Sequence, residues 1–221
     1  MRTSRLWVLS LVVLSCSVPW QAAAGPVAGS VRTLAPKGSV PAIPVIYAEP
    51  LDQPAPRQPQ RVVLGQKNKT FQPRVVAVPV GSTVDFLNND LIFHNVFSLS
   101  IPQPFDLGLY RAGETRSRTF TQPGVYRVFC NIHPQMSAIV VVAPSPFVAV
   151  VPPDGRFSLD LPVGRYRLTT LSERAAPVSA DVASVQGLAT APELQLDESA
   201  WKFIQHKNKF GQDYPAAAYR R

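Results

Sequence analysis

The sequence has 221 residues, a length that allows one large domain or two small ones. Hydrophobic residues make up 46% of it and charged residues 16%, which supports a buried core and excludes an intrinsically disordered chain. The formal charge of +8 favours acidic partners, but the basic residues are scattered and form no nucleic-acid-binding module, so we set that class aside. The 23 prolines, against 12 glycines, favour short strands joined by turns over long helices.

The N-terminus has the features of a secretory signal. Residues 1–5 carry two positive charges, residues 6–18 are almost wholly apolar, and residues 22–24 fit the small-residue cleavage rule. The apolar run is too short to span a bilayer comfortably, and no other long run follows, so we expect no membrane span. Residues 1–24 are therefore predicted to be the signal peptide of an exported, by default periplasmic, protein. Cys16 offers a rival interpretation as a lipid-modified cysteine, but its surroundings match such a site only weakly.

The segment after the signal predicts part of a small β domain. Residues 25–50 contain two predicted strands, at about residues 29–34 and 43–50. Residues 51–59 hold three prolines and are expected to be a linker. Two strands are too few to be stable alone, so they need partners from elsewhere in the chain.

Cysteine use points to a special role for Cys130. Removal of the signal also removes Cys16, which leaves Cys130 with no partner for an internal disulfide. Cysteines of exported proteins usually occur in pairs, so an unpaired one needs another explanation. Taken alone, Cys130 fits an inert buried thiol as well as a metal ligand.

The neighbours of Cys130 favour a metal site. Strands predicted at residues 125–129 and 139–142 flank a loop with the spacing Cys-x2-His-x2-Met, which contains Cys130, His133 and Met136. Thiolate, imidazole and thioether together suit copper, with the thioether as a weak axial ligand. Zinc is the nearest rival, but methionine is a poor zinc ligand. A fourth ligand has to come from another segment, and His94 supplies a second imidazole.

These residues carry a family resemblance. The segment from about residue 60 to 143 resembles the cupredoxins, the blue-copper proteins that include plastocyanin, pseudoazurin and amicyanin. Three blocks match: Phe71-Gln-Pro with the run from Val78 to Phe86, Asn88-Asn-Asp with His94-Asn-Val, and the Cys130 loop, whose short length is of the amicyanin and pseudoazurin type. Phe93 departs from the pattern, since these proteins often have Pro before the first histidine.

The resemblance implies one type 1 copper ion and assigns roles to individual residues. The implied ligands are His94, Cys130, His133 and Met136. Asn95 is expected to tie the two ligand loops together by hydrogen bonds, and such contacts orient the ligands. Pro134 lacks an N–H group, which limits hydrogen bonding near the thiolate.

The resemblance also implies a function. In cupredoxins the histidine that follows the cysteine usually reaches the surface through an apolar patch, which here would comprise Leu91, Ile92, Phe93, Ile132 and Pro134. We therefore expect a monomeric one-electron carrier that is not an enzyme. Its redox partner is expected to be a protein such as a cytochrome or an oxidoreductase, and the positive charge of the chain favours an acidic one. The alternative is a copper-binding module for carriage, storage or sensing. A structural adhesion module is a third hypothesis, because the chain contains a second domain.

The remaining segments complete the predicted architecture. Residues 60–145 are expected to form the cupredoxin domain, whose stretch at residues 101–114 resembles exported bacterial proteins labelled methylamine utilization proteins. Residues 146–196, with an Asp-Gly-Arg-Phe turn, resemble a carboxypeptidase regulatory-like β-sandwich. Residues 197–221 are a basic, aromatic tail, expected to cover that sandwich rather than to dock on a partner, with His206 exposed to solvent.

The predicted fold class is therefore all-β. It comprises a Greek-key cupredoxin β-sandwich that is inserted in, or appended to, a second small β-sandwich. We favour insertion, because the strands expected before the Asp-Gly-Arg-Phe turn of the second sandwich match residues 29–50. Insertion predicts that Val31 and Val45 pair with strands after residue 146.

Overall fold

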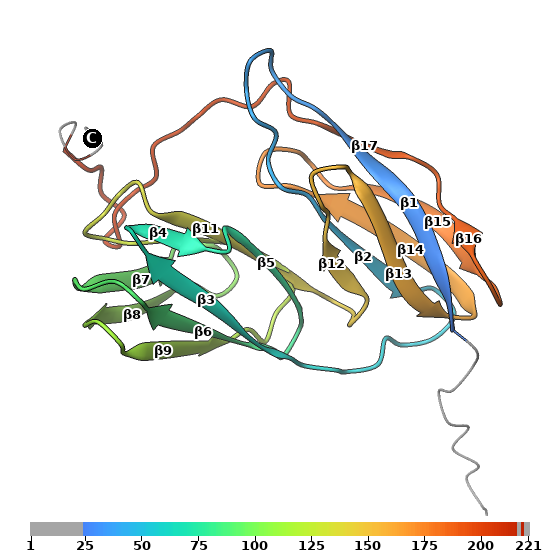
Figure 1. The fold of residues 1–221 in the computed structure, drawn as a ribbon, viewed down its shortest axis with the longest axis horizontal. Helices are drawn as coiled ribbons and strands as arrows, with labels where there is room; N and C mark the ends of the chain where they lie inside the picture. Colours follow the sequence, from blue (N-terminus) through green and yellow to red (C-terminus); the bar gives the residue numbers. More distant parts are fainter. Residues whose placement is uncertain (1–23, 216–217, 219–221) are drawn as a thin grey trace, which may run out of the picture.

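The computed structural model describes residues 24–215 and 218 (Figure 1). Its strands form four sheets, arranged as two sandwiches that lie side by side, which confirms the predicted all-β class. The predicted signal peptide, apart from Ala24, lies outside the described residues, as does Cys16. In the part of the chain that the structure describes, no helix has the length and apolar character needed to cross a membrane.

The first sandwich is built from one continuous segment. Its strands are β3 (Arg61–Lys67), β4 (Thr70–Gln72), β5 (Val75–Pro79), β6 (Thr83–Asn88), β7 (His94–Ser98), β8 (Phe105–Tyr110), β9 (Thr115–Thr119), β10 (Gly124–Phe129) and β11 (Ser137–Ala143). One sheet has the order β5-β11-β10-β7-β8 and the other the order β4-β3-β6-β9. Buried aromatic side chains, among them Phe86, Phe120 and Tyr126, fill the core between the two sheets.

The second sandwich combines strands from both ends of the chain. Its strands are β1 (Ala24–Leu34), β2 (Val45–Pro50), β12 (Val148–Val150), β13 (Arg156–Pro162), β14 (Gly164–Leu171), β15 (Val178–Ser184), β16 (Ala189–Thr190) and β17 (Leu194–Asp197). In one sheet β1 pairs with β13, β16 and β17, and the other has the order β12-β2-β14-β15. Val31 lies opposite Leu194, and Val45 lies opposite both Val150 and Leu171. The N-terminal strands therefore pair with strands that follow the first sandwich.

The surroundings of strand β11 explain why its sequence is an almost uninterrupted apolar run. Alternate side chains of a strand point to opposite faces of the sheet. Val140 and Val142 pack into the core of the first sandwich, whereas Ile139 and Val141 pack against Val45 and Leu171 of the second. Both faces of β11 are thus buried, which is the situation in which strands lose their polar alternation. An ion pair between Arg74 and Glu173 also joins the two sandwiches.

The path of the chain after β17 differs from our expectation. We expected the tail to cover the second sandwich, but only its first part does so, where the Arg174 guanidinium lies 4.2 Å from the centre of the Trp201 ring. The tail then crosses to the far end of the first sandwich (Figure 1). There the His206 ring stacks on Phe129, with 3.8 Å between ring centres, so His206 is half-buried and not a solvated residue.

Candidate metal centre

The four predicted ligands come from two segments that meet at one end of the first sandwich. His94 is the first residue of β7, where a loop enters the strand. Cys130 directly follows β10, and His133 and Met136 lie in the short loop before β11. Because β10 pairs with both β7 and β11, the strand register brings the loop and His94 together.

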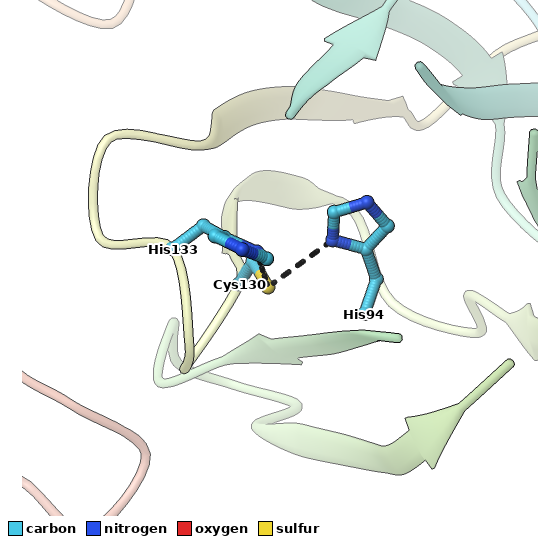
Figure 2. Close-up of side chains that lie close together, drawn as sticks. All are labelled: His94, Cys130 and His133. Atoms are coloured by element: carbon cyan, nitrogen blue, oxygen red, sulfur yellow. Dashed lines mark hydrogen bonds between the residues drawn. The ribbon is translucent and has the colours of Figure 1, made fainter. Parts of the chain in front are cut away.

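Three of the ligand atoms converge on one point. Nδ1 of His94 lies 3.8 Å from the Cys130 sulfur, and Nδ1 of His133 lies 3.7 Å from it (Figure 2). Among the described residues these three side chains form a group whose ligand atoms all lie within 4.8 Å of one another. His94 and Cys130 are fully buried, whereas His133 is partly exposed.

Met136 lies in the same loop and is buried. Its side chain is 1% exposed and belongs to the core cluster that also contains Cys130. The loop turns back on itself, since the Met136 N–H donates to the His133 carbonyl over 2.9 Å. A thiol, two imidazoles and a thioether make a donor set that fits copper, with the thioether as the axial ligand. The residues at this site therefore fit one type 1 copper ion.

A carboxylate that sequence analysis left without a role fixes the orientation of His94. Oδ2 of Asp90 lies 2.7 Å from Nε2 of the His94 ring. A carboxylate accepts, so Nε2 carries the proton and Nδ1 keeps the lone pair that faces Cys130. Burial opposes ionisation of Asp90, but hydrogen bonds from the Lys69 and Asn68 N–H groups and from His94 hold its pKa below the usual value.

The two N–H groups that hold Asp90 come from a tight turn between β3 and β4. Asn68 and Lys69 both have φ near +55°, at 54° and 55°. Two successive left-handed residues form the type I′ turn that suits a two-residue hairpin. Lysine is an unusual residue at position 69, because a left-handed conformation is energetically unfavourable for residues other than glycine. The bonds from both N–H groups to the Asp90 carboxylate offset that cost.

Asn95 connects the two ligand segments. Its backbone N–H points at the Cys130 sulfur over 3.5 Å, and its side-chain oxygen accepts from the Asn131 N–H over 3.2 Å. Its side-chain nitrogen donates to Asp106 over 2.7 Å. Burial raises the pKa of the Cys130 thiol, and hydrogen bonds from the backbones of Asn95, Ile132 and His133 counter that rise only in part. Without metal, the site therefore holds a protonated thiol.

His133 has a different environment from His94. Burial lowers its pKa, and the neighbouring His94 and Lys69 lower it further. Four apolar side chains of the predicted patch are exposed: Leu91, Ile92, Phe93 and Ile132. Pro134 is buried, so it does not belong to that exposed patch, contrary to expectation. The tail contacts this residue, since Nε2 of His206 lies 2.7 Å from the Pro134 carbonyl oxygen.

Comparison with known proteins finds similarity over the segment that contains this site. Residues 60–143 match the family model of copper binding proteins, plastocyanin/azurin family. Amicyanin-alpha of Methylorubrum extorquens is 35% identical over 75 residues, which cover 33% of this chain and 63% of that protein. The matched segment thus spans somewhat less than two thirds of this relative's length.

Solved structures also resemble part of the chain. A purple cupredoxin from Nitrosopumilus maritimus is 26% identical and matches 38% of this chain and 98% of its own, with a TM-score of 0.34. A copper-containing nitrite reductase from Thermus scotoductus is 30% identical and matches 50% of this chain and 28% of its own, with a TM-score of 0.37. Residues 60–143 thus match the plastocyanin/azurin family of copper binding proteins and are similar to amicyanin, and the donor set at this site agrees with copper binding.

Proposed function

We propose that this protein is an exported one-electron carrier. Copper at this site would cycle between Cu(II) and Cu(I). The observation that carries the proposal is the unequal exposure of the four ligands. His94, Cys130 and Met136 are buried, whereas His133 is partly exposed. An electron therefore has one short path to the surface, through the imidazole of His133.

The arrangement supports electron transfer better than catalysis. Four protein side chains supply a complete ligand set for a type 1 site, which leaves no open position for a substrate. Catalytic metal sites, by contrast, keep a position for water or substrate. The burial of three ligands also keeps water from the metal. We therefore propose that the protein is not an enzyme.

The surface around His133 supports docking of a redox partner. The exposed side chains of Leu91, Ile92, Phe93 and Ile132 form the apolar patch proposed to contact it. The formal charge of +6 that remains without Arg2 and Arg5 of the predicted signal peptide favours an acidic protein, such as a cytochrome or an oxidoreductase. The predicted signal peptide supports export, by default to the periplasm, where the metal would protect the unpaired Cys130 thiol, and we propose that the protein acts as a monomer.

The second sandwich favours one other candidate function. We propose that it belongs to the carboxypeptidase regulatory-like class, and that the whole chain resembles the exported bacterial proteins called methylamine utilization proteins. A simple electron carrier needs neither this domain nor a tail that reaches the ligand loop. Copper carriage, storage or sensing is therefore the alternative, with the additional domain as the attachment to a partner.

Voltammetry of the copper-loaded protein separates the two candidates. We expect a reversible one-electron couple and fast self-exchange between the Cu(I) and Cu(II) forms, measured by line broadening in nuclear magnetic resonance. Ile132→Lys, which places a charge in the apolar patch, should slow self-exchange, whereas Val185→Lys on the second sandwich should not. A protein that binds copper tightly but shows no reversible couple would favour copper handling instead.

A further inference from the structure

The C-terminal tail contacts the copper-ligand loop directly. It leaves the second sandwich after β17 and lies along the end of the first sandwich that holds the ligands (Figure 1). We call residues 206–214 the docked tail. Tail segments without a role are usually poorly ordered, because few contacts hold them. This one makes specific polar and aromatic contacts with residues that adjoin the ligands.

His206 contacts residues next to two ligands at once. Its ring is nearly parallel to that of Phe129, at 14°, with 3.8 Å between ring centres. Nε2 of the same ring lies 2.7 Å from the carbonyl oxygen of Pro134. Phe129 directly precedes Cys130, and Pro134 directly follows His133. One side chain of the tail therefore contacts both the residue before Cys130 and the residue after His133.

Lys209 makes a second pair of contacts. Its backbone N–H donates to Oδ1 of Asn131 over 3.0 Å, and the Tyr214 hydroxyl donates to the same oxygen over 3.5 Å. The ammonium group of Lys209 lies 2.7 Å from Oδ2 of Asp106, and the Lys209 side chain is only 26% exposed. Asn131 directly follows Cys130 in the sequence, so the tail also contacts the residue after the thiol.

These contacts join the hydrogen bonds that surround the Cys130 sulfur. Asp106 accepts from Lys209 through one oxygen and from Asn95 through the other. Asn95 in turn accepts from the Asn131 backbone and points its own N–H at the sulfur. Asn131 is therefore held by Asn95 through its main chain and by the docked tail through its side chain.

We propose that the docked tail fixes the conformation of the ligand loop, with His206 and Lys209 as positioning residues for the copper site. The tail resists opening of the loop, because an opened loop has to give up the Phe129 stack and the hydrogen bonds at Pro134 and Asn131. It thereby slows exposure of Cys130 and keeps the ligands in place when the metal is absent. Because the tail begins in the second sandwich, it also couples that sandwich to the metal centre. The proposal rests on the copper site and not on electron transfer.

The rate at which a thiol reagent labels Cys130 in the metal-free, full-length protein tests the proposal. His206→Ala removes the stack on Phe129 and the hydrogen bond to the Pro134 carbonyl, and Lys209→Met removes the ion pair with Asp106. Each hydrogen bond contributes modestly, so we expect labelling to accelerate about tenfold for His206→Ala, by a smaller factor for Lys209→Met, and further for the double variant. Lys209→Arg keeps the charge and should retain the wild-type rate.

Two matched controls distinguish positioning from general stability. Lys202→Met removes a positive charge from an exposed position of the tail before residues 206–214, so labelling should stay at the wild-type rate. Val45→Ala weakens the contact between the sandwiches far from the loop. Labelling that stays at the wild-type rate in His206→Ala, or that accelerates equally in Val45→Ala, would overturn the proposal.

A second readout uses the copper-loaded protein. If the docked tail positions the ligands, His206→Ala should change the hyperfine splitting of the Cu(II) electron-spin spectrum, which reports ligand geometry, whereas Lys202→Met should not. Neither this spectrum nor the labelling rate depends on a redox partner. The proposal therefore fails or succeeds independently of whether the protein carries electrons.

Discussion

The Asp90 carboxylate lies 2.7 Å from Nε2 of His94. This contact selects the His94 tautomer whose Nδ1 lone pair faces the Cys130 sulfur, before any metal is bound. The contact itself depends on two left-handed residues in a different hairpin, since the N–H groups of Asn68 and Lys69 hold the carboxylate. Part of the metal centre is therefore organised by a turn that contributes no ligand.

Asp90→Ala should weaken copper binding. The change removes the acceptor for His94 and leaves two turn N–H groups without their partner, and loss of such an orienting group typically lowers metal affinity about 10–100-fold. Competition with a chelator of known affinity measures the change. Asp181→Ala removes an equal charge from the second sandwich and should leave the affinity unaltered. An unchanged affinity in Asp90→Ala would show that the ring is oriented by packing alone.

Cys130→Ser should abolish the intense visible band of the Cu(II) protein. The band is a charge transfer from thiolate to copper, and Cys130 is the free cysteine of the described residues. Absorption spectra of both proteins after addition of Cu(II) provide the measurement. Persistence of the band in the variant would mean that the thiolate is not a ligand.

Met136→Leu should keep bound copper but raise the reduction potential. The thioether is a weak axial donor that favours Cu(II), and leucine fills a similar volume without donating. Voltammetry compares the two potentials. Equal potentials would show that Met136, although its carbonyl accepts from the Cys130 N–H, is not an axial ligand.

Copper binding near pH 7 should release about one proton, from the thiol. Burial raises the pKa of Cys130 above its ordinary value of 9.0, whereas burial and nearby positive charge lower the pKa of His133 below 6.5. The thiol is thus protonated and the imidazole neutral, and the apparent affinity should rise about tenfold per pH unit until the thiol pKa is reached. Calorimetry in buffers of different ionisation enthalpy counts the protons, and Cys130→Ser should release none.

The metal-free protein should lose stability as the pH falls below 6.5. His133 has a pKa below its ordinary value of 6.5 in the folded state, so the unfolded chain binds the proton first. The contribution of His133 to the free energy of unfolding is therefore fully present above pH 6.5. It decreases as the pH falls toward the lower pKa of His133 in the folded state. Urea midpoints at several pH values measure this loss, which should be smaller in His133→Gln. Equal losses in both proteins would contradict the assignment.

The ligands could be predicted from sequence because they are mostly local. Cys130, His133 and Met136 share one short loop, and their residue types alone favour copper. His94 was proposed because the loop lacked a second imidazole, and the family resemblance supported that choice, although no local pattern brings His94 to the loop. The apolar run of β11 predicted a strand, but not that its alternate residues lie in two different cores.

Other features depend on contacts between distant segments. Asp90 was visible four residues before His94, yet its role requires the turn at Asn68, which the sequence did not reveal because Lys69 is not a typical left-handed residue. The expectation that the tail covers the second sandwich was wrong for a similar reason. His206 and Pro134 are 72 residues apart, and neither has a pattern that indicates the other. Such contacts are fixed by the path of the whole chain and not by local preference.

The hydrogen bond from the Ala48 N–H to the Phe147 carbonyl bears on the order in which the protein folds. It joins residues about a hundred positions apart, and closing so long a flexible loop costs roughly 4 kcal/mol of chain entropy. Folding of the first sandwich removes most of that cost, because it holds the two ends of the intervening chain in place. Residues 60–143 are contiguous and can fold as soon as they are available, whereas the second sandwich needs β17 near the end of the chain. The domain that receives copper can therefore be complete while its host is still unfolded, and the tail reaches the ligand loop last.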